Sequence, residues 1–343
     1  MFNPYKNRNS VEGFGVIGII IALLFIVFVG GCGFPAIKLP ANATDPLREY
    51  VLEGEGHKKV ALISVNGVIS DLPSKDFLMR NTPSMMDEVI AQLNIAKQDP
   101  DVKAVVLKIN SPGGTATASD ILYKEIMDFK RQTGVPVVAS MMDLATSGGY
   151  YVSLAADLIV AHPTTITGSV GVIALTPDVS GLMDKLGIKM SVHKSGRNKD
   201  MGSMFRPGTE EENRLFDEII KDLAGRFTTL VASRRSGRSP DMEEISTARI
   251  YTAPEALKAG LIDKIGYLDY ALACAKSMAG LSQDAAVVAY RRTRYPDDTI
   301  YNPLTTSYDG GRPSLVNMGI LDAMPSLKPG FYYLWWPSAT GTN

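Results

Sequence analysis

Short apolar runs alternate with amphipathic segments between residues 59 and 162, and this alternation restricts the possible folds more than any other feature of the sequence. The apolar runs, typical of strands buried on both faces, are KVALISVNGVI (59–69), VKAVVLKIN (102–110) and VPVVASMM (135–142). Apolar residues at helical spacing separate these runs, at 84–98 and at 117–131. Strands joined through helices in this order form right-handed βαβ units. The sequence therefore predicts an α/β fold of stacked βαβ units with a mostly parallel sheet.

The same alternation continues along the chain and sets the expected domain limits. Further elements are expected at 147–156 (helix), 157–162 (strand), 209–235 (helix) and 285–290 (strand). We therefore predict one folded domain at 58–291. A polar linker that contains proline precedes it at 38–57, and a loose tail follows it at 292–343. The tail ends in the aromatic stretch PGFYYLWWP (329–337).

An uncharged apolar run occupies residues 13–37, after a short segment, residues 1–12, that carries Lys6 and Arg8. About 20 helical residues cross the hydrocarbon core of a bilayer, so this run is long enough. The positive charges before it predict a cytoplasmic N-terminus and a folded domain on the other side of the cell membrane. We expect one uncleaved transmembrane helix. Three alternatives stay open: FVGGC is a lipoprotein cleavage box that leaves Cys32 lipidated, the run is a cleaved secretory peptide, or the run is a buried helix.

Charge and residue spacing argue against several classes of function. The formal net charge is −1, which does not suit a protein that binds nucleic acid through its phosphates. The histidines, His57, His162 and His193, do not have the spacing of a metal site. The two cysteines, Cys32 and Cys274, are not expected to pair. We therefore expect no nucleic-acid partner, no metal and no cofactor.

The stretch TSGG puts Ser147 at the predicted junction of a strand and a helix, directly before Gly148. Backbone N–H groups at a helix start have no partner within the helix and point outward. Without a side chain, Gly148 lets a carbonyl group approach the backbone closely. Such N–H groups stabilise the oxyanion of a tetrahedral acyl intermediate, with Ser147 as the nucleophile. The alternative is a serine that caps the helix, followed by glycines that allow close packing.

A second glycine pair, Gly113-Gly114 in NSPGGTA, follows the predicted strand at 102–110. The carboxyl ends of neighbouring parallel strands share one edge of a sheet, where ligand crevices form. Gly114 can therefore offer a second N–H group to the same oxygen. An ordinary turn between a strand and a helix is the alternative.

Three motifs together resemble the signal peptide peptidase A family of serine peptidases: SPGG (111–114), SGGYYVSLAAD (147–157) and TGSVGVI (167–173). The resemblance extends from about residue 60 to residue 290 and implies the Clp-protease/crotonase fold. It also implies a catalytic Ser–Lys dyad instead of a triad with histidine. Lys199, just before DMGS, occupies the position of the family's lysine, and Lys194 in the same segment is the alternative.

The resemblance gives Ser169 a supporting role, in which its hydroxyl hydrogen-bonds the lysine and holds it toward Ser147. Lysine acts as a base only if its pKa falls from about 10.4 to roughly 7–8, which burial in a dry site can achieve. The implied substrates are signal peptides left in the membrane and other apolar, unfolded peptides. Short members of the family form rings in which the lysine of one subunit reaches the serine of its neighbour, so we expect a ring-forming homo-oligomer.

Two other functions remain compatible with the sequence. A crotonase-type acyl-CoA enzyme has the same pair of N–H donors but needs no serine beside the glycine, and an exported domain would have poor access to CoA. A non-catalytic membrane scaffold could keep the fold, but the presence of Ser147, Lys199 and Ser169 argues against lost chemistry. We also hypothesise that the aromatic stretch at 329–337 occupies the substrate groove. Packing of this stretch on the core or at the membrane surface is the alternative.

Overall fold

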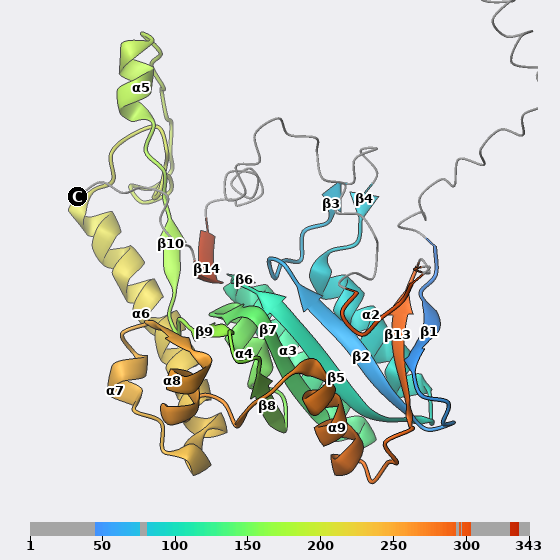
Figure 1. The fold of residues 1–343 in the computed structure, drawn as a ribbon. Helices are drawn as coiled ribbons and strands as arrows, with labels where there is room; N and C mark the ends of the chain where they lie inside the picture. The colour runs from blue at the N-terminus through green and yellow to red at the C-terminus, as the bar shows by residue number, and fades with distance from the viewer. Residues whose placement is uncertain (1–44, 76–80, 293–294, 296, 303–329, 336–343) are drawn as a thin grey trace, which may run out of the picture. The chain divides into compact units, whose positions relative to one another are not determined.

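A nine-stranded sheet runs through the part of the chain that the computed structural model describes, residues 45–75, 81–292, 295, 297–302 and 330–335 (Figure 1). Its strands are β1 (Arg48–Glu53), β2 (Lys59–Asn66), β5 (Val102–Ser111), β7 (Val137–Thr146), β8 (Leu158–Ala161), β9 (Ile166–Gly168), β11 (Ile250–Thr252), β12 (Lys264–Ile265) and β13 (Ala286–Arg291). The order is β1-β13-β2-β5-β7-β8-β12, and β9 pairs with β7 and β11. Pairing is parallel from β13 to β12 and between β7 and β9. The predicted mostly parallel α/β fold is confirmed.

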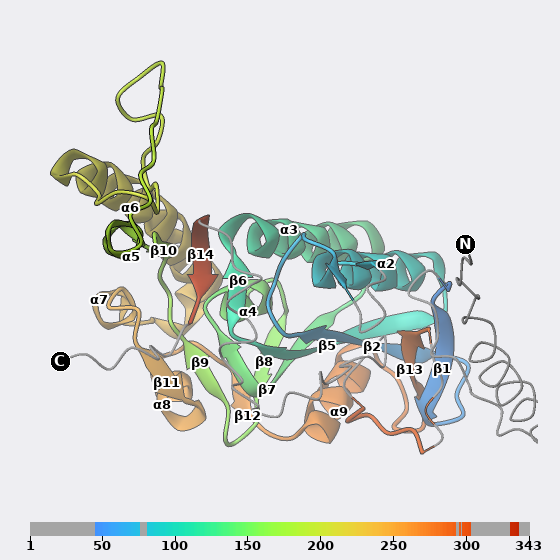
Figure 2. The same ribbon diagram turned by 90° about the horizontal axis from the view of Figure 1, so that it is seen from above.

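The two faces of this sheet bury separate hydrophobic cores. One face carries α2 (Met85–Gln98), α3 (Ala116–Thr133) and α4 (Gly148–Ser153), and the other carries α9 (Leu268–Met278) (Figure 2). On β5, Leu107 and Ile109 belong to the first core, whereas Ala104 and Val106 belong to the second. Successive side chains of a strand point to opposite faces, so a strand covered on both sides must be apolar throughout. This requirement explains the apolar runs of the sequence.

Local signals in the sequence fix the ends of the two helices that follow β2 and β5. The Ser84 side chain accepts a hydrogen bond from the backbone N–H of Asp87, which caps α2. The Thr115 side chain caps α3 in the same way, by accepting from the N–H of Ala118. At the other end of α3, Gly134 adopts a left-handed conformation with φ of 69°. Both helices lie where the sequence predicts them.

The remaining elements lie mostly beyond β8. The helices are α5 (Ser180–Lys185), α6 (Glu210–Arg234), η1 (Ser236–Arg238), α7 (Met242–Ile245) and α8 (Ala253–Lys258). The strands outside the large sheet are β3 (Ser74–Lys75), β4 (Asn81–Thr82), β6 (Gly113–Thr115), β10 (Ile173–Leu175) and β14 (Gly330–Leu334). β6, β14 and β10 form a small second sheet with β14 in the middle. Residues 176–208, which we call the arm, project away from the α/β core between β10 and α6 (Figures 1 and 2).

Two terminal segments differ from what the sequence suggests. The expected linker at 38–57 contains β1, which pairs antiparallel with β13 and so extends the large sheet. The expected loose tail at 292–343 contains β14. The expected anchor at 13–37 lies outside the described residues. The described residues all belong to one compact unit, Ala41–Asn343. Within the described ranges, no helix is both long enough and apolar enough to cross a membrane.

Candidate active site

Ser147 forms a strained turn between β7 and α4. Its backbone has φ of 52° and ψ of −114°, a combination that residues with a side chain rarely adopt. Its N–H donates to the carbonyl of Gly168 at 2.7 Å, and only 1% of the residue is exposed. The Ser147 side chain makes no capping hydrogen bond to α4. Helix capping therefore does not explain why a serine occupies this turn.

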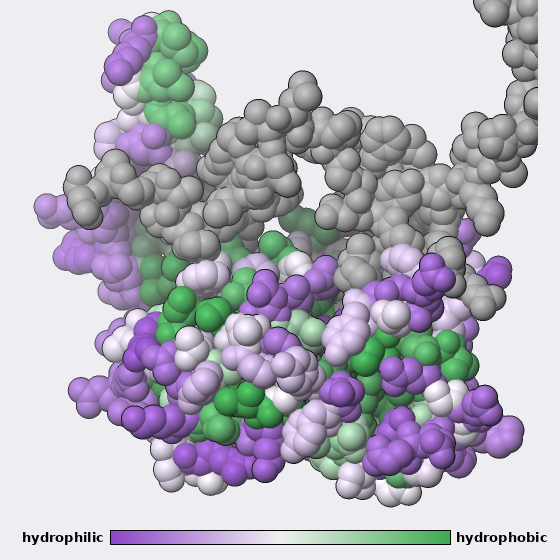
Figure 3. Space-filling view, viewed as in Figure 1, coloured by the Kyte–Doolittle hydropathy of each residue, from purple (hydrophilic) through white to green (hydrophobic). Residues whose placement is uncertain are grey.

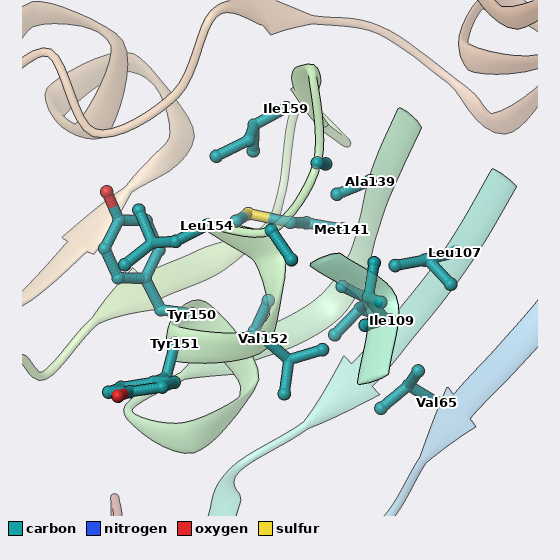
Figure 4. Close-up of a cluster of buried hydrophobic side chains, with 14 of the residues drawn as sticks. Val65, Leu107, Ile109, Ala139, Met141, Tyr150, Tyr151, Val152, Leu154 and Ile159 are labelled. Carbon is teal, nitrogen blue, oxygen red and sulfur yellow. The ribbon is translucent and has the colours of Figure 1, made fainter. Parts of the chain in front are cut away.

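The residues that follow Ser147 anchor the short helix α4 in the core. The Tyr150 hydroxyl donates to the carbonyl of Leu261 at 2.9 Å, and the Tyr151 hydroxyl donates to Asp120 at 2.6 Å. Burial raises the pKa of both Tyr150 and Tyr151, so both hydroxyls remain donors. Figure 4 shows these two rings on one side of α4, away from the strand residues of the core. Such anchoring offsets the cost of the strained turn at Ser147.

Two glycines bring the start of β6 against the start of α4. A Cβ atom on Gly113 would lie 2.7 Å from the backbone nitrogen of Gly148, and Gly113 has φ of 101°. A Cβ atom on Gly148 would lie 3.1 Å from the Cα of Gly113. These approaches exclude a side chain at Gly113 and restrict one at Gly148. The two predicted glycine junctions are therefore neighbours in space.

β14 lies directly against these glycines. It pairs antiparallel with β6, with Tyr333 opposite Gly114. The N–H of Trp335 donates to the carbonyl of Pro112 at 2.9 Å. In an antiparallel pair of strands, every second pair of opposite residues exchanges backbone hydrogen bonds. Trp335 and Pro112 form one such pair, so Tyr333 and Gly114, two positions away on each strand, form the next. The N–H of Gly114 therefore points toward the carbonyl of Tyr333.

The same carbonyl also lies close to the start of α4. Cβ atoms on Gly113 and Gly148 would lie 2.0 Å and 3.0 Å from the Tyr333 carbonyl oxygen. One peptide carbonyl of β14 therefore lies against both predicted oxyanion glycines, Gly114 and Gly148, one residue from Ser147.

The structure also brings Ser169 next to Ser147. Thr146 of β7 pairs with Gly168 of β9, so each serine is the residue that follows a paired position. Ser169 has φ of 53°, and its N–H donates to the carbonyl of Arg249 at 2.8 Å. Nothing in the sequence points to Arg249, because the contact uses the backbone carbonyl of a residue that lies far along the chain, directly before β11.

Within one chain, Lys199 does not lie with Ser147 and Ser169. It lies in the arm, in a run of exposed residues, 184–199. Its ammonium group has no hydrogen-bond or ion-pair partner among the residues that the structure describes. The alternative, Lys194, forms an ion pair with Asp200 at 2.6 Å. Arg206 and then Lys194 hold the pKa of the Asp200 carboxyl well below its usual range.

His162 does not belong to this group either. Its Nδ1 lies 2.8 Å from the hydroxyl of Thr164, and its ring packs edge-on against Tyr267. These contacts give His162 a structural role.

Comparisons with known proteins agree with the resemblance seen in the motifs. The profile of Peptidase family S49 matches residues 129–282, and the Clp protease profile matches residues 76–167. A putative signal peptide peptidase SppA of Enterococcus faecium is 37% identical over 254 residues, which cover 74% of this chain and 73% of that protein.

Two other relatives extend the comparison. A putative protease of Methanocaldococcus jannaschii is 31% identical over 78% of this chain and 85% of its own length. Protease 4 of Salmonella typhi is 34% identical over 65% of this chain but only 35% of its own length. Together with the mostly parallel α/β fold, these similarities identify the chain as a member of peptidase family S49, the signal peptide peptidase A family of serine peptidases.

Proposed function

We propose that this protein is a membrane-anchored serine endopeptidase that uses a Ser–Lys dyad to degrade residual signal peptides and other apolar, unfolded peptides. One observation carries the proposal: the Tyr333 carbonyl lies against Gly113 and Gly148, beside the strained turn at Ser147. β14 therefore serves as an example of how an extended peptide binds, as an added strand between β6 and β10.

The proposed chemistry is acyl transfer. The neutral amine of Lys199 takes the proton of the Ser147 hydroxyl, and the Oγ atom forms a bond to the peptide carbonyl carbon. The N–H groups of Gly114 and Gly148 stabilise the oxyanion. The C–N bond then breaks, and Lys199 returns the proton to the leaving amine. Water attacks the acyl-serine to release the second product, so no metal or cofactor takes part.

Lys199 requires a partner in this proposal, since it is exposed in the arm of a single chain. We propose that it reaches Ser147 of a neighbouring subunit in a ring, where the contact would bury the amine and lower its pKa. The arm supports this because it exposes large apolar side chains: Leu182, Leu186, Ile188, Met190, Val192 and Phe205. Figure 3 shows apolar residues gathered along one side of the arm near α5. Exposed apolar surface of this kind marks an interaction site.

The membrane anchor is proposed from the sequence alone. Residues 13–37 are proposed as a single-pass anchor with a cytoplasmic N-terminus and an extracytoplasmic peptidase domain. An anchor would keep the domain close to peptides that remain in the bilayer. Protease protection of the domain in sealed membrane vesicles tests this orientation.

A fluorophosphonate probe tests the proposed chemistry on the full chain. We expect covalent labelling of Ser147, loss of labelling and of peptide cleavage in Ser147→Ala, and normal labelling in Ser246→Ala, which changes an exposed serine. An unlabelled protein that converts an acyl-CoA thioester would instead support the crotonase-type alternative. Absence of both activities from an oligomeric, folded protein would favour the scaffold.

A further inference from the structure

Arg206 connects the segment that carries Lys199 to the first turn of α6. Its Nε and Nη2 atoms donate to the two carboxylate oxygens of Asp200, each at 2.9 Å, and Nη2 also donates to the Asp200 backbone carbonyl at 3.1 Å. The same guanidinium donates to one carboxylate oxygen of Glu212 through Nη1 at 3.0 Å and to the other through Nη2. Arg206 therefore holds Asp200, the residue directly after Lys199, by its side chain and by its backbone.

Glu212 gives Arg206 a fixed attachment point. It lies in the first turn of α6, and only 2% of it is exposed. Its carboxylate also accepts from the N–H of Thr209 at 3.0 Å, and the Thr209 hydroxyl accepts from the N–H of Glu212, which completes a capping box. The hydrogen bonds from Arg206 and then from Thr209 lower the pKa of the Glu212 carboxyl, so it is ionised at neutral pH.

The turn around Lys199 is also held within the same chain. The N–H of Lys199 donates to the carbonyl of Gly196 at 3.1 Å. The Lys194 ammonium group donates to the carbonyl of Arg197 at 2.8 Å and to the Asp200 carboxylate at 2.6 Å, so it joins the two sides of the turn. The backbone on both sides of Lys199 is thus fixed, whereas its own amine has no partner among the residues that the structure describes.

We propose that Arg206 is a positioning residue for the base: by fixing Asp200, it sets the position from which Lys199 presents its amine to Ser147 of the neighbouring subunit. The proposal rests on the proposed peptidase function and adds a residue to it. In this role Arg206 touches neither the substrate nor the reacting atoms. It is needed in the subunit that supplies the lysine and not in the subunit that supplies the serine.

The contacts of Arg206 require an arginine rather than any cation. A guanidinium is a planar fork of five N–H groups that can pair with two carboxylates at once, whereas an ammonium group is a point charge on a flexible stem. A lysine at position 206 would keep the charge but lose the paired contacts with Asp200 and Glu212. The turn beside Lys199 would then be less well fixed, and a misplacement of about 1 Å costs roughly a hundredfold in rate.

The first test compares Arg206→Lys with Arg197→Lys in the full-length protein. Both variants make the same chemical change in the arm, but the Arg197 side chain is 79% exposed and forms an ion pair with Glu211 only. We expect Arg206→Lys to lower kcat by about tenfold to hundredfold and to leave KM within about twofold, because the strands that bind the peptide are unchanged. Arg197→Lys should keep both values. Equal effects of the two variants, or a higher KM with an unchanged kcat, would overturn the proposal.

The second test determines which subunit needs Arg206. In mixed rings of Ser147→Ala and Lys199→Ala subunits, every complete site takes its lysine from a Ser147→Ala subunit. Adding Arg206→Lys to the Ser147→Ala subunit should therefore lower the activity of the mixture by the same factor of about ten to a hundred. Adding it to the Lys199→Ala subunit should leave the mixture as active as before, since that subunit supplies only the serine.

Gel filtration and differently tagged subunits verify that the rings form and mix. Equal losses in the two mixtures, or an Arg206→Lys protein that no longer forms rings, would assign Arg206 to assembly and overturn the proposal. Mixed rings that are inactive even with Arg206 intact would contradict its action on a neighbouring site.

The outcome for wild type separates this proposal from the proposed function. Wild-type protein that is labelled at Ser147 and cleaves peptides, beside an Arg206→Lys protein with full kcat, would exclude the role of Arg206 and leave the peptidase function intact. Wild-type protein that is neither labelled nor cleaves any peptide would overturn the function itself.

Discussion

Ser147 and Ser169 occupy matching positions at the ends of two adjacent parallel strands. Thr146 pairs with Gly168, and the N–H of Ser147 donates to the Gly168 carbonyl at 2.7 Å. Both serines have positive φ, 52° and 53°, which residues with a Cβ atom seldom adopt. Strain of this kind persists only where the surrounding structure enforces it, and it is common at active sites. The pair therefore marks the edge of the sheet at which we propose the chemistry.

The first prediction distinguishes the effect of the Ser169 hydroxyl on activity from the effect of the Ser169 backbone conformation on stability. Ser169→Gly suits a positive φ, whereas Ser169→Ala keeps the strain, so the glycine variant should be the more stable by about 1 kcal/mol. Both variants should lose activity by about tenfold to hundredfold, because the proposed hydrogen bond between the Ser169 hydroxyl and Lys199 is lost. Thermal unfolding and kcat/KM measure the two effects. Full activity in Ser169→Gly would show that the hydroxyl has no role.

The second prediction concerns the close approach of the peptide carbonyl to Gly113. A Cβ atom there would lie 2.0 Å from the Tyr333 carbonyl oxygen. In Gly113→Ala, the new methyl group should displace a substrate carbonyl that binds in the position of the Tyr333 carbonyl. It should therefore reduce kcat/KM by roughly a hundredfold, as expected for a misplacement of about 1 Å. Gly134→Ala is the control, since Gly134 also has positive φ, 69°, but has open space around its Cβ position. It should lose stability and keep its kinetics, and equal kinetic losses in the two variants would contradict the steric explanation.

The third prediction tests which side chain is the base. Lys199→Ala should abolish peptide cleavage without unfolding the protein, and Lys199→Arg should be equally inactive because a guanidinium group does not lose its proton. His162→Ala should keep most of the activity, since its contacts are with Thr164 and Tyr267. Circular dichroism checks the fold of each variant. A folded but inactive His162→Ala would exclude the Ser–Lys assignment.

The fourth prediction tests whether the dyad is shared between subunits. Ser147→Ala and Lys199→Ala proteins are each expected to be inactive, but mixed rings would contain sites with both intact residues. Random mixing in a closed ring gives such a site at about one position in four, so activity should return to roughly a quarter of the wild-type value. Differently tagged subunits verify the mixing. Mixed rings that stay inactive would place the dyad within one chain.

The fifth prediction concerns Lys108, a buried lysine far from the proposed chemistry. Burial, and then the charge of Arg291, lowers the pKa of Lys108 to about 8. Its ammonium group donates to the carbonyls of Ile300 and Asn302. Since the unfolded chain holds this proton up to about pH 10.4, the contribution of Lys108 to stability rises from about pH 8 to pH 10.4.

The matching measurement compares the free energy of unfolding of wild type and Lys108→Met between pH 7 and pH 10. The difference should move in favour of the wild type as pH rises, by up to about 3 kcal/mol. Leu107→Met, a substitution on the same strand that removes no titratable group, should follow the wild-type pH dependence. A difference between wild type and Lys108→Met that does not change with pH would contradict the lowered pKa.

The sequence by itself determined the parallel sheet, most helix and strand positions and the family. A strand that is buried on both faces of the sheet, such as 102–110, needs apolar residues throughout, so its position can be predicted from residue type alone. The helix starts are also local features, because the Ser84 and Thr115 side chains accept hydrogen bonds from N–H groups three residues further along the chain. The glycines beside Ser147 were visible as motifs for the same reason: a close backbone approach permits no other residue.

Only the tertiary structure decided which distant segments meet. Nothing local in PGFYYLWWP specifies that Tyr333 pairs with Gly114, because backbone hydrogen bonds between strands carry no sequence code. For the same reason, the sequence does not indicate that the N–H of Ser169 donates to the Arg249 carbonyl. The sequence does not indicate β1 within the expected linker, because all six of its residues are exposed or half-buried and it lacks an apolar run. Lys199 illustrates the remaining limit: the fold of one chain leaves it exposed in the arm. The contact with a neighbouring subunit that we propose for its amine is not a property of a single chain.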